Sequence, residues 1–291
     1  MASMNKLTTA KRAEVIGLLC EGMSMRAICR TTGVARQTIS DLLEKVGITA
    51  SDYQANAFVD LPCKVIECDE IWSFCYSKEK NVPADKQDEY GFGDVWTWTA
   101  IDADTKLVPS WLVGERTISD AWVFLSDLKS RLKDTRIQLT TDGLRNYMTV
   151  VDGLWADEID FAMLHKIYGR PVAKPSPERK YSPDICTGID VRVIAGNPDP
   201  SRISTSYVER NNLTMRMGMR RFTRLTNGFS KKVEFHAHAV SLNFLYYNFA
   251  RARQSLRVKN ADGTFTKRSP AMAAGKADHI WSTREIAKLL D

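Results

Sequence analysis

The sequence lacks any long hydrophobic run. No stretch of 18 or more apolar residues occurs in the 291-residue chain, so we expect no membrane-spanning helix. The first residues, MASMNKLTTAKR, also lack the apolar core of a secretory signal peptide. No internal repeat is present. These absences lead us to expect a globular protein of the cytoplasm with no membrane partner.

Cysteines suited to a metal site or a disulfide framework are also missing. The six cysteines include no C-x-x-C pair. Cys63 and Cys68 have four residues between them, but no second Cys/His pair at zinc spacing completes a site. We therefore expect reduced and mostly buried thiols.

Proline is scarce outside one segment. Six of the ten prolines lie in residues 170–200. Because proline removes a backbone donor and interrupts regular structure, this stretch is predicted to be an irregular insertion.

Charge is distributed unevenly along the chain, although the net charge is only +6. Residues 60–160 hold 11 Lys/Arg and 20 Asp/Glu, whereas residues 209–257 hold 10 and 2. The first 50 residues hold 7 and 4. An acidic centre between basic ends is typical of a metal-binding core with nucleic-acid-binding arms.

The N-terminal pattern predicts three helices, over about 9–20, 25–32 and 35–46. Ser24 is a candidate N-cap, and Gly33 and Gly47 are candidate C-terminal stops. Two short helices around a glycine turn form a helix-turn-helix pattern. The second of them opens with polar side chains of the kind that contact bases and phosphates, namely Arg36, Gln37, Thr38 and Ser40.

The central pattern predicts an α/β fold. Apolar alternation indicates strands at about 65–72, 94–102, 106–115, 136–141 and 159–167. Helical spacing indicates helices at about 119–133 and 144–154, around Glu209, at 231–253, and weakly at 282–290. The order is that of a mixed sheet flanked by helices, and the helix at 231–253 is apolar nearly all round, so we expect it to be deeply packed.

Three acids have settings that suggest one catalytic site. Asp69 lies in a buried strand, Asp142 ends a later strand before Gly143, and Glu209 lies on a predicted helix. Since neighbours on a strand point to opposite faces, Asp69 is favoured over Glu70. Carboxylates in such positions bind divalent cations, so two Mg²⁺ ions, with Mn²⁺ as a substitute, are the expected cofactors for phosphodiester chemistry.

Basic residues surround the predicted glutamate. They are expected to contact the DNA backbone and are Arg210, Arg216, Arg220, Arg221, Arg224, Lys231 and Lys232. Asn212, near Glu209 on the helix, and His236 are possible accessory residues.

Several motifs resemble those of one transposase family. The segments CDEIWSF, VGERT, TTDGLRNY and STSYVERNNLTMRMGMRRFTRLTNGFSKKVEFH resemble transposases of the insertion-sequence-one family of bacterial mobile elements. The resemblance covers about residues 60–250. It implies an RNase H-like DDE catalytic domain whose acids are Asp69, Asp142 and Glu209. It further implies action on terminal inverted repeats and target DNA, as a homodimer or larger assembly associated with the nucleoid.

The predicted organisation has four parts. A helix-turn-helix domain (1–50) and a linker (51–60) precede the catalytic domain (61–255), which contains the insertion at about 170–200, and a basic tail (256–291) follows. Two alternatives remain open: a helix-turn-helix regulator without catalysis, and a structure-specific RNase H-like nuclease such as a junction resolvase.

Overall fold

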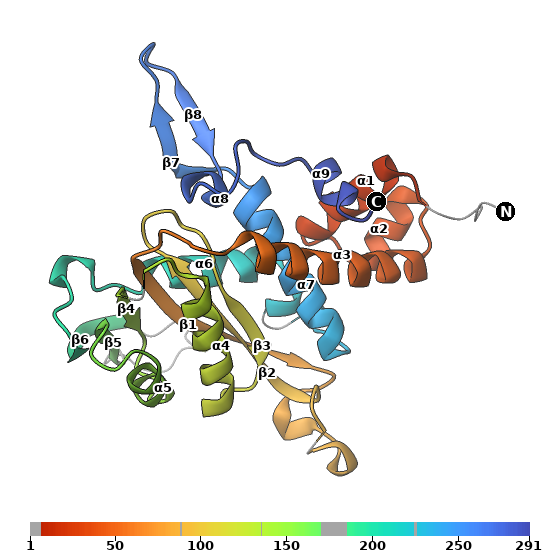
Figure 1. Cartoon of the computed structure of the whole chain (residues 1–291). Helices are drawn as coiled ribbons and strands as arrows, with labels where there is room; N and C mark the ends of the chain where they lie inside the picture. Colours follow the sequence, from red (N-terminus) through yellow and green to blue (C-terminus); the bar gives the residue numbers. More distant parts are fainter. Residues whose placement is uncertain (1–6, 88, 135, 170–184, 224–225) are drawn as a thin grey trace.

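A six-stranded mixed sheet forms the centre of the computed structural model, which describes residues 7–87, 89–134, 136–169, 185–223 and 226–291 (Figure 1). Strands β1 and β2, β2 and β3, and β5 and β6 pair antiparallel, whereas β1 and β4, and β4 and β5, pair parallel. In spatial order the strands are β3 (Trp111–Gly114), β2 (Gly93–Asp102), β1 (Val65–Cys75), β4 (Gln138–Thr141), β5 (Asp160–Gly169) and β6 (Ile185–Ala195). The predicted α/β class, a mixed sheet flanked by helices, is confirmed.

Helices cover both faces of the sheet because its central strands are apolar on both sides. On β1, Ile66 packs in the cluster that contains Phe124 of α4, whereas Ile71 packs with Val208 of α6 and Phe244 of α7. The covering helices are α4 (Ile118–Arg131) and α5 (Asn146–Trp155) on one face, and α6 (Ser206–Gly218) and α7 (Val233–Leu245) on the other.

Three N-terminal helices pack beside this sheet, namely α1 (Thr9–Cys20), α2 (Met25–Thr32) and α3 (Arg36–Ala57). The predicted cap of α2 is confirmed, since the Ser24 hydroxyl accepts a hydrogen bond from the Ala27 amide. Gly33 ends α2 at φ 72°, a left-handed conformation that glycine adopts without strain. The turn between α2 and α3 therefore lies at the predicted position.

Helix α3 does not stop at Gly47 as predicted; it continues to Ala57 and replaces most of the expected linker 51–60. The physical reason is the close approach of α7. A Cβ at residue 47 would lie 2.5 Å from the His238 Cβ, and the Ser241 hydroxyl donates to the Gly47 carbonyl at 2.7 Å. Glycine serves here as a packing contact between helices, and not as a terminator.

Helix α7 lies between the sheet and α3, as its all-round apolar pattern predicted. Val240 and Phe244 pack in the apolar cluster that contains Ile71 of β1. Leu242 and Leu245 belong instead to the apolar cluster that also includes residues of α3. A π-helical turn at Tyr246–Ala250 follows, so the regular helix is shorter than the predicted 231–253.

Two further expectations need correction. Residues 185–195 form strand β6, paired along β5, whereas irregular structure was predicted over 170–200. Residues 170–184 lie outside the described residues.

The predicted tail 256–291 is also structured: β7 (Arg253–Lys259) and β8 (Phe265–Arg268) form a hairpin, and α8 (Pro270–Ala273) and α9 (Thr283–Lys288) follow. Helix α9, weakly predicted, packs against α1 through Ile286 and Ala287, whose side chains find an apolar partner only in the folded chain.

Among the residues that the structure describes, no helix is long and apolar enough to cross a bilayer. All six cysteines are free, and only Cys186 is exposed.

The close approach of α3 and α7 makes Gly47 sensitive to substitution. Gly47→Ala places a methyl group against the His238 backbone and is expected to lower the free energy of unfolding by about 1–3 kcal/mol, measured by urea unfolding. Gly218→Ala is the matched control, because a Cβ there meets nothing within 4 Å. Equal stability of the two variants would contradict the packing role of Gly47.

Candidate active site and nucleic-acid interface

Parallel pairing of β1 and β4 brings the first two predicted acids together. The last paired residues are Cys68 and Thr141, so the next residues are Asp69 on β1 and Asp142, which directly follows β4. One carboxylate oxygen from each of Asp69, Glu70 and Asp142 lies within 4.8 Å of the others. These three residues could therefore hold a cation at this edge of the sheet.

Asp69 and Glu70 point to opposite faces of β1, as predicted for neighbours on a strand, and they contact different helices. Asp69 Oδ2 accepts a hydrogen bond of 2.8 Å from the Asn212 amide on α6. Glu70 Oε1 instead accepts a hydrogen bond of 2.5 Å from the Tyr147 hydroxyl on α5. Glu70 is buried and held by protein partners, whereas Asp69 lines an open cleft.

Glu67 positions the helix that carries Glu209. It lies two residues before Asp69 on the same face of β1, and its Oε2 accepts hydrogen bonds from the Tyr207 and Val208 amides at 2.7 and 3.0 Å. A carboxylate at a helix N-terminus satisfies free amides and complements the helix dipole. Sequence reasoning missed this role, although the acid at position 67 in VIECDEIW was a visible signal.

Arg116 is a second residue that sequence reasoning missed. Its Nη2 lies 3.0 Å from Glu70 Oε2 and 3.5 Å from Asp142 Oδ2, so one guanidinium bridges both carboxylates. The guanidinium also stacks over the Trp96 ring at 4.7 Å. Its position directly after β3, within the VGERT motif, was the available signal.

The third predicted acid lines the same cleft but is paired differently. The Glu209 carboxylate forms an ion pair with Lys166 of β5 and accepts a hydrogen bond of 2.7 Å from the Thr205 hydroxyl. It is not part of the 4.8 Å carboxylate cluster. Lys166 neutralises Glu209, and a cation bound at Asp69 and Asp142 would compete for the same carboxylate.

The cleft has a volume of about 810 Å³. Its wall includes His165, whose ring packs so closely on Gly143 that a side chain at position 143 would displace it. The lining residues are Asp69, Arg116, Asp142, Gly143, Leu144, Arg145, Leu164, His165, Lys166, Tyr168, Thr205, Glu209, Asn212 and Arg216.

Burial and neighbouring acids raise the pKa of two carboxyl groups at this edge of the sheet. Burial, together with the negative charges of Asp142 and Glu209, raises the pKa of Asp69 to about 7. Burial and the charges of Asp142 and Asp69 raise the pKa of Glu70 to about 8, against the lowering effect of Tyr147 and Arg116. Acids whose charged forms repel one another in this way favour a bound cation.

The donor atoms suit a hard divalent cation. Carboxylate oxygens are the ligands that Mg²⁺ and Mn²⁺ prefer. The Asn212 Oδ1 is buried and has no hydrogen-bond partner, so one further oxygen is available beside Asp69. The residues therefore fit the expected ions, with Asp69 and Asp142 as the central pair.

His236 does not lie where an accessory site residue would. It is fully buried, its ring nitrogens lie 3.3 Å from the Ser73 hydroxyl and 2.8 Å from the Ser230 hydroxyl, and it does not line the acidic cleft. Burial and the charge of Arg221 lower the pKa of His236 to about 3. Its accessory role is corrected to that of a neutral core histidine.

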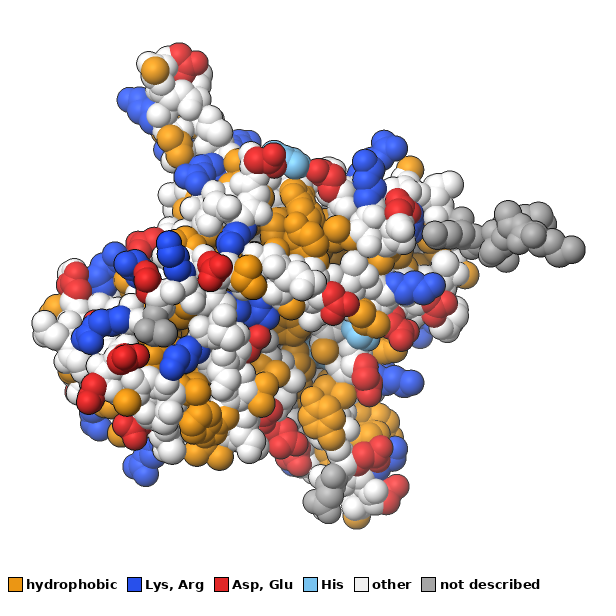
Figure 2. Space-filling view, viewed as in Figure 1, with side chains coloured by type: hydrophobic (Ala, Val, Ile, Leu, Met, Phe, Trp, Pro, Cys, Tyr) orange, Lys and Arg blue, Asp and Glu red, His pale blue; other side chains and the backbone are white. Residues whose placement is uncertain are grey.

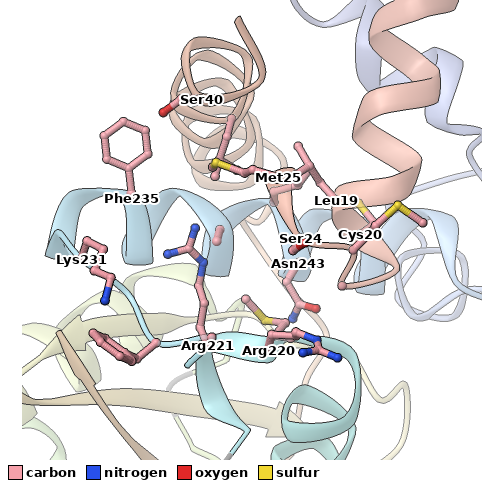
Figure 3. Close-up of a pocket in the computed structure, with 18 of the residues that line it drawn as sticks. Leu19, Cys20, Ser24, Met25, Ser40, Arg220, Arg221, Lys231, Phe235 and Asn243 are labelled. Atoms are coloured by element: carbon pink, nitrogen blue, oxygen red, sulfur yellow. The ribbon is translucent and has the colours of Figure 1, made fainter. Parts of the chain in front are cut away.

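Most of the predicted DNA-contacting residues gather in a groove between the N-terminal helices and the sheet domain (Figure 3). Arg220, Arg221 and Lys231 come from the segment between α6 and α7, and Ser40 lies across from them on α3. Lys232 and Gln37 also line this groove, whose volume is about 600 Å³. The groove combines cations with apolar side chains such as Phe229 and Phe235.

The remaining predicted contacts are dispersed. Arg36 is exposed at the start of α3, and Thr38 beside it is half-buried. Arg210 is exposed on α6, whereas Arg216 lines the acidic cleft. Arg224 lies outside the described residues. The cations thus divide between the groove, the cleft and the surface.

No protein-family model and no curated protein sequence matches the chain. Among solved structures, the chain is similar to a pre-cleavage Mos1 transpososome, with 13% identity and a TM-score of 0.24 over 55% of this chain and 61% of that one. It thus spans less than two thirds of that Mos1 chain.

Two further structures are similar at comparable levels. A piggyBac transposase synaptic complex with hairpin DNA has 12% identity and a TM-score of 0.35, covering 100% of this chain and 73% of that one. A Mos1 mariner paired-end complex with Mn has 12% identity and a TM-score of 0.24, covering 85% and 80%. Because all three scores are below 0.5, the functional assignment depends on the site geometry.

The raised pKa of Asp69 predicts a pH-dependent stability. The native carboxyl has a pKa of about 7 and the unfolded one about 3.8, so the native state binds the extra proton between these values. Without metal, the free energy of unfolding should fall as the pH rises through this window. Asp69→Asn should flatten that fall and stabilise the chain at pH 8 by on the order of 1–2 kcal/mol.

Urea unfolding in EDTA at pH 5 and pH 8 measures this effect. Asp152→Asn, which removes an exposed carboxylate of α5 outside the cleft, is the control and should keep the wild-type pH dependence. An unchanged pH dependence in Asp69→Asn would contradict the electrostatic coupling in the cleft.

The Lys166–Glu209 ion pair predicts competition between lysine and metal. Lys166→Met frees the Glu209 carboxylate and should tighten Mn²⁺ binding by about three- to tenfold, because a fixed positive charge is removed. Isothermal titration calorimetry measures the change. Lys133→Met, at an exposed position outside the cleft, should bind Mn²⁺ as the wild type does, and weaker binding by Lys166→Met would contradict the competition.

Proposed function

We propose that the protein is a Mg²⁺-dependent DNA transposase of a bacterial insertion sequence, related to the insertion-sequence-one family. It would bind terminal inverted repeats, cleave the DNA strands there and join them to target DNA. The observation that carries this proposal is one cleft lined by Asp69 and Asp142 on adjacent parallel strands and by Glu209 on a facing helix. The motif resemblance supports the same reading.

Asp69, Asp142 and Glu209 would hold the two ions, with the Asn212 amide oxygen as a further donor. When bound, the ions would activate the attacking water or DNA 3′-hydroxyl and stabilise the leaving oxygen. No protein nucleophile is required.

The chain's other residues in the cleft would set the reacting geometry. Arg116 holds Glu70 and Asp142 in place, so that the carboxylates remain close despite their repulsion. Glu67 fixes the first turn of α6, and with it the position of Glu209. Arg145 and Arg216 line the cleft and would orient the scissile phosphate by charge-assisted hydrogen bonds.

The groove between α3 and the 219–232 segment would carry the adjoining DNA backbone. Arg220, Lys231 and Lys232 supply phosphate contacts, while exposed Arg36 on α3 is available for contacts outside the groove. Two transposon ends must be joined in one reaction, so we propose a homodimer or larger assembly on DNA.

A cleavage and strand-transfer assay tests the proposal. The substrate is DNA that carries the element's own ends, taken from the genomic flanks, with Mg²⁺, Mn²⁺ or Ca²⁺. Cuts at the ends and joined products are expected with Mg²⁺ or Mn²⁺. Asp142→Asn should lower the rate at least about 10²-fold, because it removes a metal-binding carboxylate, whereas Asp152→Asn should retain activity.

The other outcomes identify the alternatives. Binding of the ends without cleavage in Mg²⁺ or Mn²⁺ would contradict the transposase and favour a helix-turn-helix regulator. Cleavage that is indifferent to the ends but sensitive to DNA junctions would favour a resolvase. Equal activity of Asp142→Asn and wild type would contradict the proposed site.

A further inference from the structure

The hairpin β7–β8 projects from the body of the molecule (Figure 1). Residues 257–267 are all exposed. A two-stranded ribbon without a covering layer is only marginally stable in water. The stability of this hairpin therefore depends on contacts at its base.

The base of the ribbon is joined firmly to the core. The Arg253 guanidinium stacks over the Tyr247 ring at 4.4 Å, and Arg268 donates to the Met272 carbonyl at 2.7 Å. Ser269 is buried and caps α8, whose Ala271 is also buried. The ribbon therefore leaves the molecule in a defined direction.

The ribbon is basic and almost free of acids. Residues 253–268 contain five Lys/Arg and one acid, Asp262. That acid lies in the turn, where its carboxylate accepts hydrogen bonds from the amide and hydroxyl of Thr264. Figure 2 shows basic side chains along the projecting arm and acidic atoms near its tip.

Three of the five cations share one face of the outer part of the ribbon. Lys259 and Phe265 are directly opposed across the strands, and Lys267 lies two residues from Phe265 on the same side. The pairing register shifts between Arg253 and Val258, so the position of Arg257 on this face follows from its contact with Phe265. The Arg257 guanidinium stacks over the Phe265 ring at 4.1 Å. The opposite face carries the uncharged pair Val258 and Thr266.

These cations have no carboxylate partner in the described part of the chain. The ion pairs between described residues do not include Arg257, Lys259 or Lys267. Three like charges held on one face repel each other, and a polyanion relieves that repulsion. A two-stranded ribbon also matches the width of the DNA major groove, about 12 Å.

We propose that the β7–β8 ribbon is a DNA-binding arm whose basic face, formed by Arg257, Lys259, Phe265 and Lys267, contacts the phosphate backbone of duplex DNA. None of these residues lines the acidic cleft or the groove beside α3. The arm is thus a separate contact that adds sequence-independent affinity. This inference rests on the proposed function only in that the ligand is DNA.

The test uses the full-length chain and a fluorescent duplex of arbitrary sequence, in EDTA, over a series of salt concentrations. The combined variant Arg257→Gln, Lys259→Gln, Lys267→Gln is expected to weaken binding about tenfold. The slope of log K against log salt should fall in magnitude by about 2 to 3, since each lost phosphate contact removes roughly 0.9.

Two control variants isolate the charge of that face. Arg257→Lys with Lys267→Arg keeps the charge, and Val258→Thr changes the opposite face; both should retain the wild-type salt slope. An unchanged slope in the neutral variant would overturn the proposal. A shift of its oligomeric state by light scattering, without a change in DNA affinity, would instead identify the arm as a contact between copies of this chain.

Binding and cleavage measurements on the same variants distinguish the arm proposal from the catalytic proposal. The neutral variant should still cleave end-bearing DNA in Mg²⁺ at saturating DNA concentration, whereas Asp142→Asn should bind but not cleave. If the unaltered chain bound no duplex of arbitrary sequence, the arm proposal alone would be overturned. Binding without cleavage by the wild type would overturn the catalytic proposal alone.

Discussion

The concentration of negative charge at one edge of the sheet is the constraint on which the site depends. Asp69, Glu70 and Asp142 approach within 4.8 Å because β1 and β4 run parallel and in register. The protein offsets their repulsion with Arg116, which bridges Glu70 and Asp142, and with the Asn212 amide on Asp69. Burial, together with the remaining negative charge, raises the pKa of Asp69 and leaves the cleft suited to a divalent cation.

Helix α7 connects this site to the N-terminal helices. It presents Val240 and Phe244 to the sheet and Leu242 and Leu245 to the cluster shared with α3. The close contact at Gly47 allows α3 to continue past the expected boundary and to pack along α7. As a result, the polar start of α3 and the basic segment before α7 line the same groove.

Sequence patterns were sufficient where local chemistry decides the outcome. The apolar alternation of β1 and β2, the Ser24 cap and the Gly33 turn were all predicted and are present. Local sequence patterns fail where contacts with a distant segment decide the structure. Gly47 has the local signature of a helix stop, but α7 packs on it, and strand β6 was missed because only the long β5 edge gives the 185–195 segment its pairing partner.

The order of elements from β1 to β5, the mixed-sheet class and the three candidate acids followed from the sequence alone, since strand and helix periodicities are local properties. Tertiary structure decided the rest. It placed Glu209 with Lys166 outside the tight carboxylate cluster, made Glu67 and Arg116 supports of the site, and confined His236 to the core. The reason is physical: burial, ion pairing and pKa shifts depend on which side chains meet across the fold, and that is set by distances between segments far apart in the chain.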